Sequence, residues 1–224
     1  MKKLLIIVAI IGLNSIVVAQ NPDIDLDRIS QKKLKKSLVK TKLFLVENIS
    51  ELAPTCPRIK DSTHYHHIYT TYIDAPIDSV WKAYTTINPS KVWAGKFSSF
   101  GFGYARKSGK ILYQNEEFNH LEEGLIQFLS LRFFGGFLKL NIAHELIRID
   151  EETKRLQFCY MRYGKSRGTQ IITLEADKNR TKIIHNTYYK SKSKFRDKRL
   201  YPYFHEKAVE ELHANIGYLI TDES

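Results

Sequence analysis

The stretch YIDAPIDSVW at residues 72–81 contains the end of one structural element and the start of another. Residues 66–73 lead into it and are rich in Tyr, Thr and Ile, the aromatic and β-branched side chains that suit a strand. Pro76 fits the first turn of a helix, where its missing N–H costs nothing. The apolar residues that follow recur at helical spacing: Val80, Trp81, Tyr84 and Ile87. The stretch therefore predicts a strand that turns directly into an amphipathic helix, with Trp81 as a structural residue.

Downstream, strand-like runs alternate with turn residues. After a short helix at 90–95, strands are predicted at 97–104, 110–113, 125–134, 137–149, 156–163, 169–176 and 182–190. Gly135-Gly136 is typical of the tight turns between them. Consecutive hairpins of this kind favour an antiparallel meander. A last helix is predicted over 201–220, with one apolar face formed by Phe204, Ala208, Leu212, Ile216 and Leu219.

This order of elements, with the Ala-Pro break and the Val80-Trp81 pair on the first helix, resembles the START-like (helix-grip) superfamily, which includes polyketide cyclases and the birch-pollen allergen family. Residues 156–163 and 169–188, which include TKIIH at 181–185, are similar to its paired late strands. The resemblance covers residues 65–220 and implies an α+β fold, in which a curved antiparallel sheet wraps around a long C-terminal helix. It also implies a cavity for a lipid, a sterol, a polyketide or another apolar molecule. A minority of members are enzymes, and no catalytic set spans the superfamily, so no catalytic residue is transferred.

The N-terminus has the three parts of a secretory signal peptide. Lys2 and Lys3 are followed by an apolar run over 4–18, and Val17-Val18-Ala19 suits a signal peptidase. The alternative is an uncleaved anchor, but a membrane span needs roughly 20 apolar residues. We therefore expect residues 1–19 to be a signal peptide, and the mature chain to begin at Gln20 and to be exported to the periplasm or beyond.

Residues 20–62 are expected to form a helical extension and a linker before a ligand-binding domain at 63–224. A basic amphipathic helix is predicted over 22–53, with Ile29, Leu34, Leu38, Phe44, Leu45, Ile49 and Leu52 on its apolar face. Pro54 and Pro57 then mark the linker. Such a helix either packs on its own domain or lies on an anionic membrane surface.

The chain is basic, with 35 Lys and Arg against 24 Asp and Glu and a formal net charge of +11. A field of this sign favours anionic partners, and for an exported protein these are head groups, polysaccharide or acidic small molecules rather than nucleic acid. Cys56 and Cys159 are its two cysteines. They form one disulfide in an oxidising compartment, or Cys159 is a buried thiol.

Candidate cavity residues come from the strands at 137–149 and 156–163 and from the last helix. Alternation places His144 on one face with Leu138, Leu140, Ile142 and Leu146. A His on such a face is either an acid, base or ligand-orienting donor, or a core residue satisfied by one hydrogen bond. His205 and His213 flank the apolar face of the last helix, either at the cavity mouth or in solvent. The predicted cavity set is Ile142, His144, Tyr160, Phe204, His205, Ala208 and Leu212.

A basic patch is predicted just before the last helix, with Lys190, Lys192, Lys194 and Arg196 as its core. It is either a site for phosphate or lipid head groups or a solvated loop. His64, His66 and His67 lack partners at the spacing of zinc sites. The glycines of FGFGYA at 100–105 lack the third glycine and the setting of a dinucleotide loop. No metal and no cofactor is therefore predicted.

Together these patterns favour an exported, non-enzymatic protein that encloses a lipid-like or other apolar small molecule between the sheet and the last helix. Two alternatives stay open. One is a polyketide cyclase-like enzyme that uses His144 or Tyr160 for proton transfer. The other is a membrane-surface interaction protein of the cell envelope.

Overall fold

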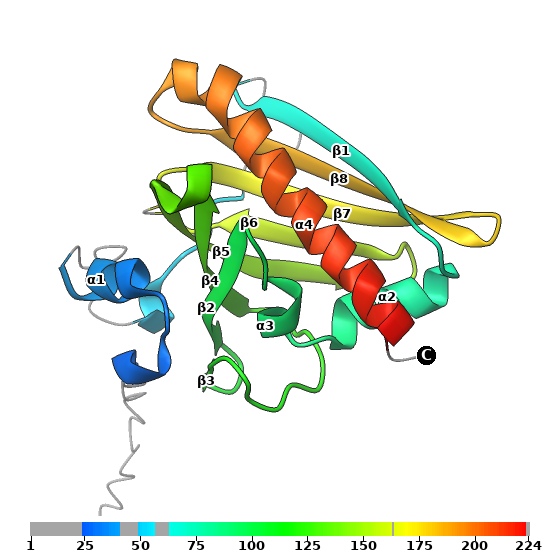
Figure 1. Ribbon diagram of the computed structural model, residues 1–224, viewed down its shortest axis with the longest axis horizontal. Helices are drawn as coiled ribbons and strands as arrows, with labels where there is room; N and C mark the ends of the chain where they lie inside the picture. Colours follow the sequence, from blue (N-terminus) through cyan, green and yellow to red (C-terminus); the bar gives the residue numbers. More distant parts are fainter. Residues whose placement is uncertain (1–23, 41–48, 57–62, 163, 223–224) are drawn as a thin grey trace, which may run out of the picture.

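The computed structural model describes residues 24–40, 49–56, 63–162 and 164–222. The predicted signal peptide at 1–19 and Gln20 lie outside these residues, as do Phe44, Leu45 and Pro57 of the extension. One antiparallel sheet curves around a long helix, α4 (Tyr201–Asp222), which crosses its inner face (Figure 1). The predicted α+β arrangement, with a curved antiparallel sheet and a long C-terminal helix, is confirmed.

The sheet has eight strands in the order β1-β8-β7-β6-β5-β4-β2-β3. Their bounds are β1 Tyr65–Ile73, β2 Ser98–Ala105, β3 Lys110–Leu112, β4 Leu125–Phe133, β5 Leu138–Asp150, β6 Arg155–Tyr160, β7 Arg167–Asp177 and β8 Arg180–Lys190. From β4 to β8 each strand pairs with the next, as the turn residues predict. β1 then pairs with β8, in a register that sets Ile73 opposite Thr181.

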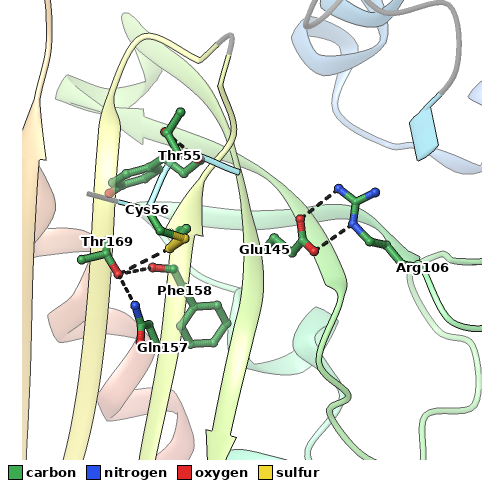
Figure 2. The surroundings of a disulfide bond; sticks show 9 residues. Thr55, Cys56, Arg106, Glu145, Gln157, Phe158 and Thr169 are labelled. Atoms are coloured by element: carbon green, nitrogen blue, oxygen red, sulfur yellow. Dashed lines mark hydrogen bonds and ion pairs between the residues drawn. A yellow bond between two sulfur atoms is a disulfide. The ribbon is translucent and has the colours of Figure 1, made fainter. Parts of the chain in front are cut away.

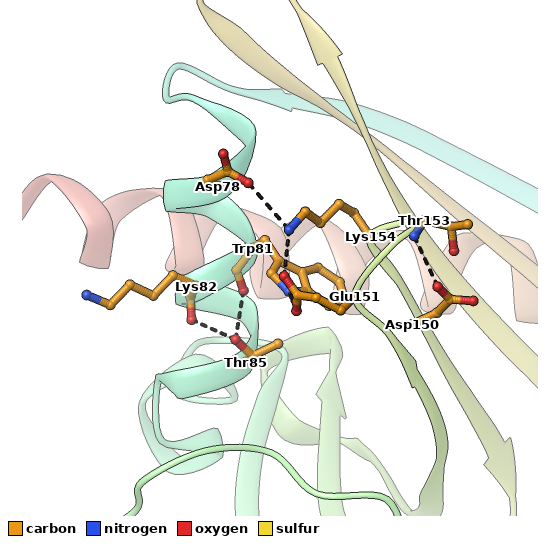
Figure 3. A network of polar contacts seen from close by, with 8 residues as sticks. All are labelled: Asp78, Trp81, Lys82, Thr85, Asp150, Glu151, Thr153 and Lys154. Atoms are coloured by element: carbon orange, nitrogen blue, oxygen red, sulfur yellow. Dashed lines mark hydrogen bonds and ion pairs between the residues drawn. The ribbon is translucent and has the colours of Figure 1, made fainter.

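Two short helices follow the YIDAPIDSVW stretch: α2 (Ile77–Thr86) and α3 (Pro89–Val92). Trp81 on α2 is 4 % exposed, so it is a core residue as predicted. Its indole N–H donates to the carboxylate of Glu151 in the β5–β6 turn (Figure 3). Lys154 bridges that turn to α2, because its ammonium lies 2.6 Å from Glu151 and 3.4 Å from Asp78. The helix is therefore fixed on the hairpin as well as on the core.

The N-terminal extension covers the outer face of the sheet, beside β4 and β5 (Figure 1). Its described part is not the single helix predicted over 22–53, which is a correction. It contains a 3-10 turn, η1 (Leu26–Arg28), then helix α1 (Lys32–Lys40) and a second 3-10 turn, η3 (Ile49–Glu51). Ile29 interrupts the predicted helix, because its backbone is extended. Its side chain is fully buried, so packing of this side chain overrides the local helix propensity.

An apolar cluster on this outer face, called the outer cluster below, joins the extension to the sheet. It is formed by Ile29, Leu34, Ile49, Leu52, Phe102, Tyr104, Tyr113, Ile126, Phe128, Ala143 and Met161. Gly101 makes room for it. A Cβ on Gly101 would lie 2.2 Å from Leu34 Cδ2 and 2.9 Å from the Phe128 carbonyl oxygen. Gly101 is therefore required for the close approach of the extension.

A disulfide joins the extension to β6. Cys56 and Cys159 are bonded across a sequence separation of 103 residues, which settles the alternative left open above (Figure 2). Beside it, Thr55 N donates to the Tyr160 carbonyl oxygen at 2.8 Å. Arg106 pairs with Glu145 at 2.8 Å and donates to the carbonyl oxygens of Ser50 and Leu52. The extension is thus held by one covalent bond and several polar contacts.

Within the described residues, no helix is both long and apolar enough to cross a membrane.

Candidate functional site

A cavity of about 220 Å³ lies between the first half of α4 and the inner face of β5–β7. Its lining is mainly apolar and aromatic: Trp93, Leu131, Leu138, Leu140, Ile142, Tyr160, Leu200, Tyr201, Phe204, Ala208 and Val209. The alternation of β5 positions one side of it, because Leu138, Leu140, Ile142 and His144 share the inner face. The intervening Ala143 belongs to the outer cluster.

The predicted cavity residues line this space, with the exception of Leu212. Leu212 lies one to two turns further along α4 and lines a smaller space of about 40 Å³ with Tyr84, Ile216 and others. Trp93, His144 and Gln170 line both spaces. The larger cavity therefore sits at the N-terminal half of α4, and close packing of apolar side chains takes over toward its C-terminal half.

His144 is 2 % exposed, and its protonation is set by its neighbours. The Gln127 side-chain oxygen lies 3.0 Å from Trp93 Nε1 and 3.3 Å from His144 Nε2. An indole N–H can only donate, so the Gln127 amide must present its oxygen, and His144 Nε2 must carry the proton. Burial lowers the pKa of His144 to about 4, so the ring is neutral at pH 7. Its Nδ1 is then a buried lone-pair acceptor, with no partner among the described residues.

A second polar network, a series of side-chain hydrogen bonds, runs from Tyr84 on α2 to His205 on α4. It comprises Tyr84 Oη–His213 Nδ1 at 2.5 Å, His213 Nε2–His185 Nδ1 at 3.1 Å, His185 Nε2–Gln170 Oε1 at 3.0 Å and His205 Nε2–Gln170 Oε1 at 3.1 Å. Because an amide oxygen can only accept, His185 and His205 both donate to it from Nε2. The Nδ1 of His205 is left as a second buried acceptor, unpaired within the described chain.

The three histidines of this network, His185, His205 and His213, are neutral at pH 7. Burial lowers the pKa of His205 and of His213 to about 3, and for His205 the neighbouring histidines add to the effect. Burial and the neighbouring histidines also hold the pKa of His185 well below its usual range. His205 and His213 are both buried, so the alternative that they form a solvent-exposed flank is wrong. The physical reason is that Gln170, His185 and Tyr84 supply partners inside the core.

Two tyrosines complete the polar groups of the lining. The hydroxyls of Tyr160 and Tyr201 lie 2.5 Å apart, and the Tyr201 ring stacks on Tyr189 with centroids 3.6 Å apart. Burial raises the pKa of Tyr160 to about 12, and burial together with the nearby Tyr160 holds the pKa of Tyr201 well above its usual value. Both hydroxyls therefore remain protonated at neutral pH, as hydrogen-bonding groups rather than bases.

One end of the cavity, called the mouth below, contains the cations Lys165 and Arg196. Arg196 donates to the Lys165 carbonyl oxygen at 3.1 Å and to the Ser166 hydroxyl. Within the predicted basic patch, Arg196 lines the cavity itself, whereas Lys190 and Lys192 line an adjoining surface pocket that also includes Arg196. Lys194 lines neither of these two spaces. Of the predicted patch, Arg196 thus lies at the mouth of the cavity, and Lys190 and Lys192 lie beside it.

The histidines at 64–67 serve other contacts. His66 bonds to Asn186 Oδ1 at 3.1 Å and stacks on Tyr188, and His67 lies 3.6 Å from a Glu206 carboxylate oxygen. In the parts of the chain that the structure describes, no group of three or more His, Cys, Asp or Glu side chains is placed to hold a metal ion.

Sequence reasoning missed Gln127, Gln170 and His185, which fix the tautomers of the cavity histidines. A signal for the two glutamines was present in the sequence: Gln127 interrupts an apolar strand run between Ile126 and Phe128, and Gln170 directly precedes the apolar pair Ile171-Ile172 in a predicted strand. A polar residue at such a position needs a partner inside the core.

No family model matches the chain, and no curated protein sequence is similar to it. Solved structures do match. A norcoclaurine synthase point mutant from Thalictrum flavum, in complex with a transition-state analogue, is 16 % identical, with 71 % of this chain and 96 % of that chain covered and a TM-score of 0.52. A protein from Thermus thermophilus is 13 % identical, with coverages of 71 % and 99 % and a TM-score of 0.52. A major latex-like protein from Panax ginseng is 13 % identical, with coverages of 69 % and 96 % and a TM-score of 0.51.

These likenesses concern the fold. The chain has the helix-grip fold, as its sequence resemblance implies.

Proposed function

We propose that this protein is an exported binding protein that encloses an apolar small molecule in the cavity between α4 and β5–β7. The observation that carries the proposal is the cavity itself, about 220 Å³ of space with a mainly apolar lining and a few buried polar groups. Specific small-molecule sites combine these two features, because apolar walls supply affinity and a few polar groups fix orientation.

The charge state of the lining supports binding rather than acid–base catalysis. A general base works best when its pKa is near the operating pH. The pKa of His144 is lowered to about 4 and that of His205 to about 3, whereas that of Tyr160 is raised to about 12. At pH 7 these groups neither accept nor release protons readily. They are suited to hydrogen-bonding a ligand, and the unpaired Nδ1 atoms of His144 and His205 favour one that carries an O–H or N–H group.

Two further observations support parts of the proposal. The T. flavum norcoclaurine synthase has also been solved with dopamine and hydroxybenzaldehyde, so a protein of this fold forms complexes with small organic molecules. Export is supported by the signal-peptide pattern at 1–19 and by the disulfide between Cys56 and Cys159, since disulfides persist mainly in oxidising compartments.

A filled-cavity variant tests the binding proposal. The neutral fluorescent probe N-phenyl-1-naphthylamine should bind the parent protein saturably, at one site per chain. Ala208→Phe places a ring in the cavity and should weaken probe binding about tenfold or more, with little loss of thermal stability because the ring enters existing space. Ala214→Phe, at an exposed position on the same helix, is the matched control and should bind as the parent does. Absence of saturable binding to the parent would overturn the proposal.

A further inference from the structure

Large apolar side chains that face solvent adjoin the lining of the cavity. Leu200 lines the cavity and is itself exposed. Phe134 and Tyr203 contact the ring of Phe204, another lining residue, with centroids 5.8 and 5.5 Å apart. Phe137, in the same turn as Phe134, is 97 % exposed. Phe195, which is also exposed, directly precedes Arg196 of the mouth. These five exposed residues are called the apolar rim: Phe134, Phe137, Phe195, Leu200 and Tyr203.

This exposure is concentrated at the mouth. Among the described residues, the other exposed large hydrophobic side chains are Ile68, Tyr72 and Tyr218. Single exposed apolar residues are normal on a soluble protein, but a contiguous group marks an interaction surface. The rim is such a group, since its members come from the β4–β5 turn and from residues 195–203 at and just before the start of α4. The two segments meet at Phe204, which Phe134 and Tyr203 both contact.

The β4–β5 turn holds its two phenylalanines outward by an unusual backbone. Phe134 has a φ of 52°, and Gly135 and Gly136 follow with φ of 65° and 94°. A bulky residue rarely adopts this left-handed conformation. A strained backbone that displays an uncovered aromatic side chain is a reason to look for a function of that side chain.

Cations lie next to the rim. A surface pocket of about 520 Å³ shares Lys165 and Arg196 with the cavity mouth and adds Arg167, Lys190 and Lys192. None of these five cations is ion-paired to a carboxylate in the described structure. Asp197, the acidic residue in the segment between β8 and α4, is 1 % exposed, and its Oδ2 accepts a hydrogen bond from Ser191 N at 2.8 Å. The surface at the mouth is therefore strongly positive.

We propose that the mouth docks on an anionic lipid membrane, with the apolar rim inserted at the interface and the five cations against the head groups. Exposed aromatic side chains beside Lys and Arg are the combination that binds such an interface, since the rings enter the head-group region and each cation gains from the negative surface potential. In this orientation the cavity opens toward the bilayer, so an apolar ligand passes between membrane and protein without crossing water. The docking face is thus the mouth, and the basic helix α1 packs on the opposite face of the sheet.

Vesicle sedimentation tests this proposal separately from ligand binding. The mature protein should bind vesicles of phosphatidylcholine mixed with phosphatidylglycerol about tenfold or more tightly than vesicles of phosphatidylcholine alone. Raised salt should weaken the binding. Inorganic phosphate at constant ionic strength should not compete, and competition would instead indicate a pocket for free phosphate and overturn the proposal.

Matched variants locate the surface. Phe137→Ser and the double variant Lys190→Glu, Lys192→Glu should each lower vesicle affinity about tenfold. None of these three residues lines the cavity, so binding of the neutral probe should persist as the control for folding. Tyr218→Ser and the double variant Lys82→Glu, Lys107→Glu change exposed residues elsewhere and should bind vesicles as the parent does. Equal binding to both vesicle types, or equal losses in the rim and control variants, would overturn the docking proposal. If the parent protein binds anionic vesicles but does not bind the probe, the proposed function is overturned and the docking proposal stands.

Discussion

The two faces of the sheet are closed in different ways. On the outer face, Ile29, Leu34, Phe102 and Phe128 are at most 1 % exposed, and the rings of Phe102 and Phe128 stack with centroids 4.2 Å apart. The inner face leaves about 220 Å³ open under α4 and buries four neutral histidines. Empty space and buried polar groups both lower stability. The difference teaches that the outer face contributes stability which allows the inner face to keep a cavity.

The sharpest way to break this comparison is to shorten one phenylalanine on each face. Phe128→Ala should cost about 3–5 kcal/mol, because the side chain is fully packed in the outer cluster. Phe204→Ala should cost clearly less, because that ring already borders open space and its removal enlarges an existing cavity. Urea unfolding of both variants measures the difference. Equal losses would show that the inner face is as tightly packed as the outer one.

Removal of the disulfide tests the outer face alone. The double variant Cys56→Ala, Cys159→Ala should lose about 2–4 kcal/mol of unfolding free energy, since the bond closes a long loop in the unfolded chain. Probe binding at the cavity should persist, because neither cysteine lines it. Thermal unfolding and probe titration of the same sample give both values. A variant that loses its cavity along with its stability would show that the two faces are not separable.

Acid tests the inner face. The folded-state pKa values of His144, His205 and His213 are lowered to about 4, 3 and 3, whereas an exposed His in the unfolded chain titrates near 6.5. Between pH 6.5 and pH 4 the unfolded chain therefore binds more protons than the folded chain. The contribution of these neutral histidines to the free energy of unfolding is complete above pH 6.5 and falls as the pH decreases toward 4. Each such histidine should remove about 2 kcal/mol by pH 5. Unfolding free energies measured from pH 8 to pH 4.5 check this, and His144→Leu should flatten the slope. A flat profile in the parent would mean that these rings are solvated.

The smallest expected effect concerns the ligand's polar group. His144 offers a lone pair at Nδ1, so 1-naphthol should bind better than naphthalene by about 1 kcal/mol, the value of one hydrogen bond. His144→Leu should remove that preference while retaining naphthalene binding. Calorimetric titration of both ligands against both proteins measures it. An unchanged preference in the variant would assign the contact to another group, such as the unpaired Nδ1 of His205.

The features predicted best from the sequence are those that depend on local pattern. Alternation along residues 138–146 identified the inner face of β5, and helical spacing identified Trp81 as a core residue and Phe204 and Ala208 as facing the sheet. The polar networks could not be found in this way, because their members come from separate elements. Gln127 and His144 are brought together by the pairing of β4 with β5, and Trp93 reaches them from the end of α3. The extension shows the same limit. Its apolar face was evident, but the surface that it covers depends on Gly101 in a strand far along the chain.

The pairing of β1 with β8 has a consequence for how quickly the domain can assemble. The two strands are adjacent in the sheet but lie near opposite ends of the domain's sequence. The disulfide also joins cysteines that are 103 residues apart in the sequence. Contacts between distant segments slow folding, because loop-closure entropy must be overcome before they form. During synthesis the β4–β7 meander can form early, while β1 waits for β8 to emerge and exposes an unpaired edge in the meantime. We therefore expect late closure of the sheet, a rate-limiting step at which the chain is most prone to aggregate.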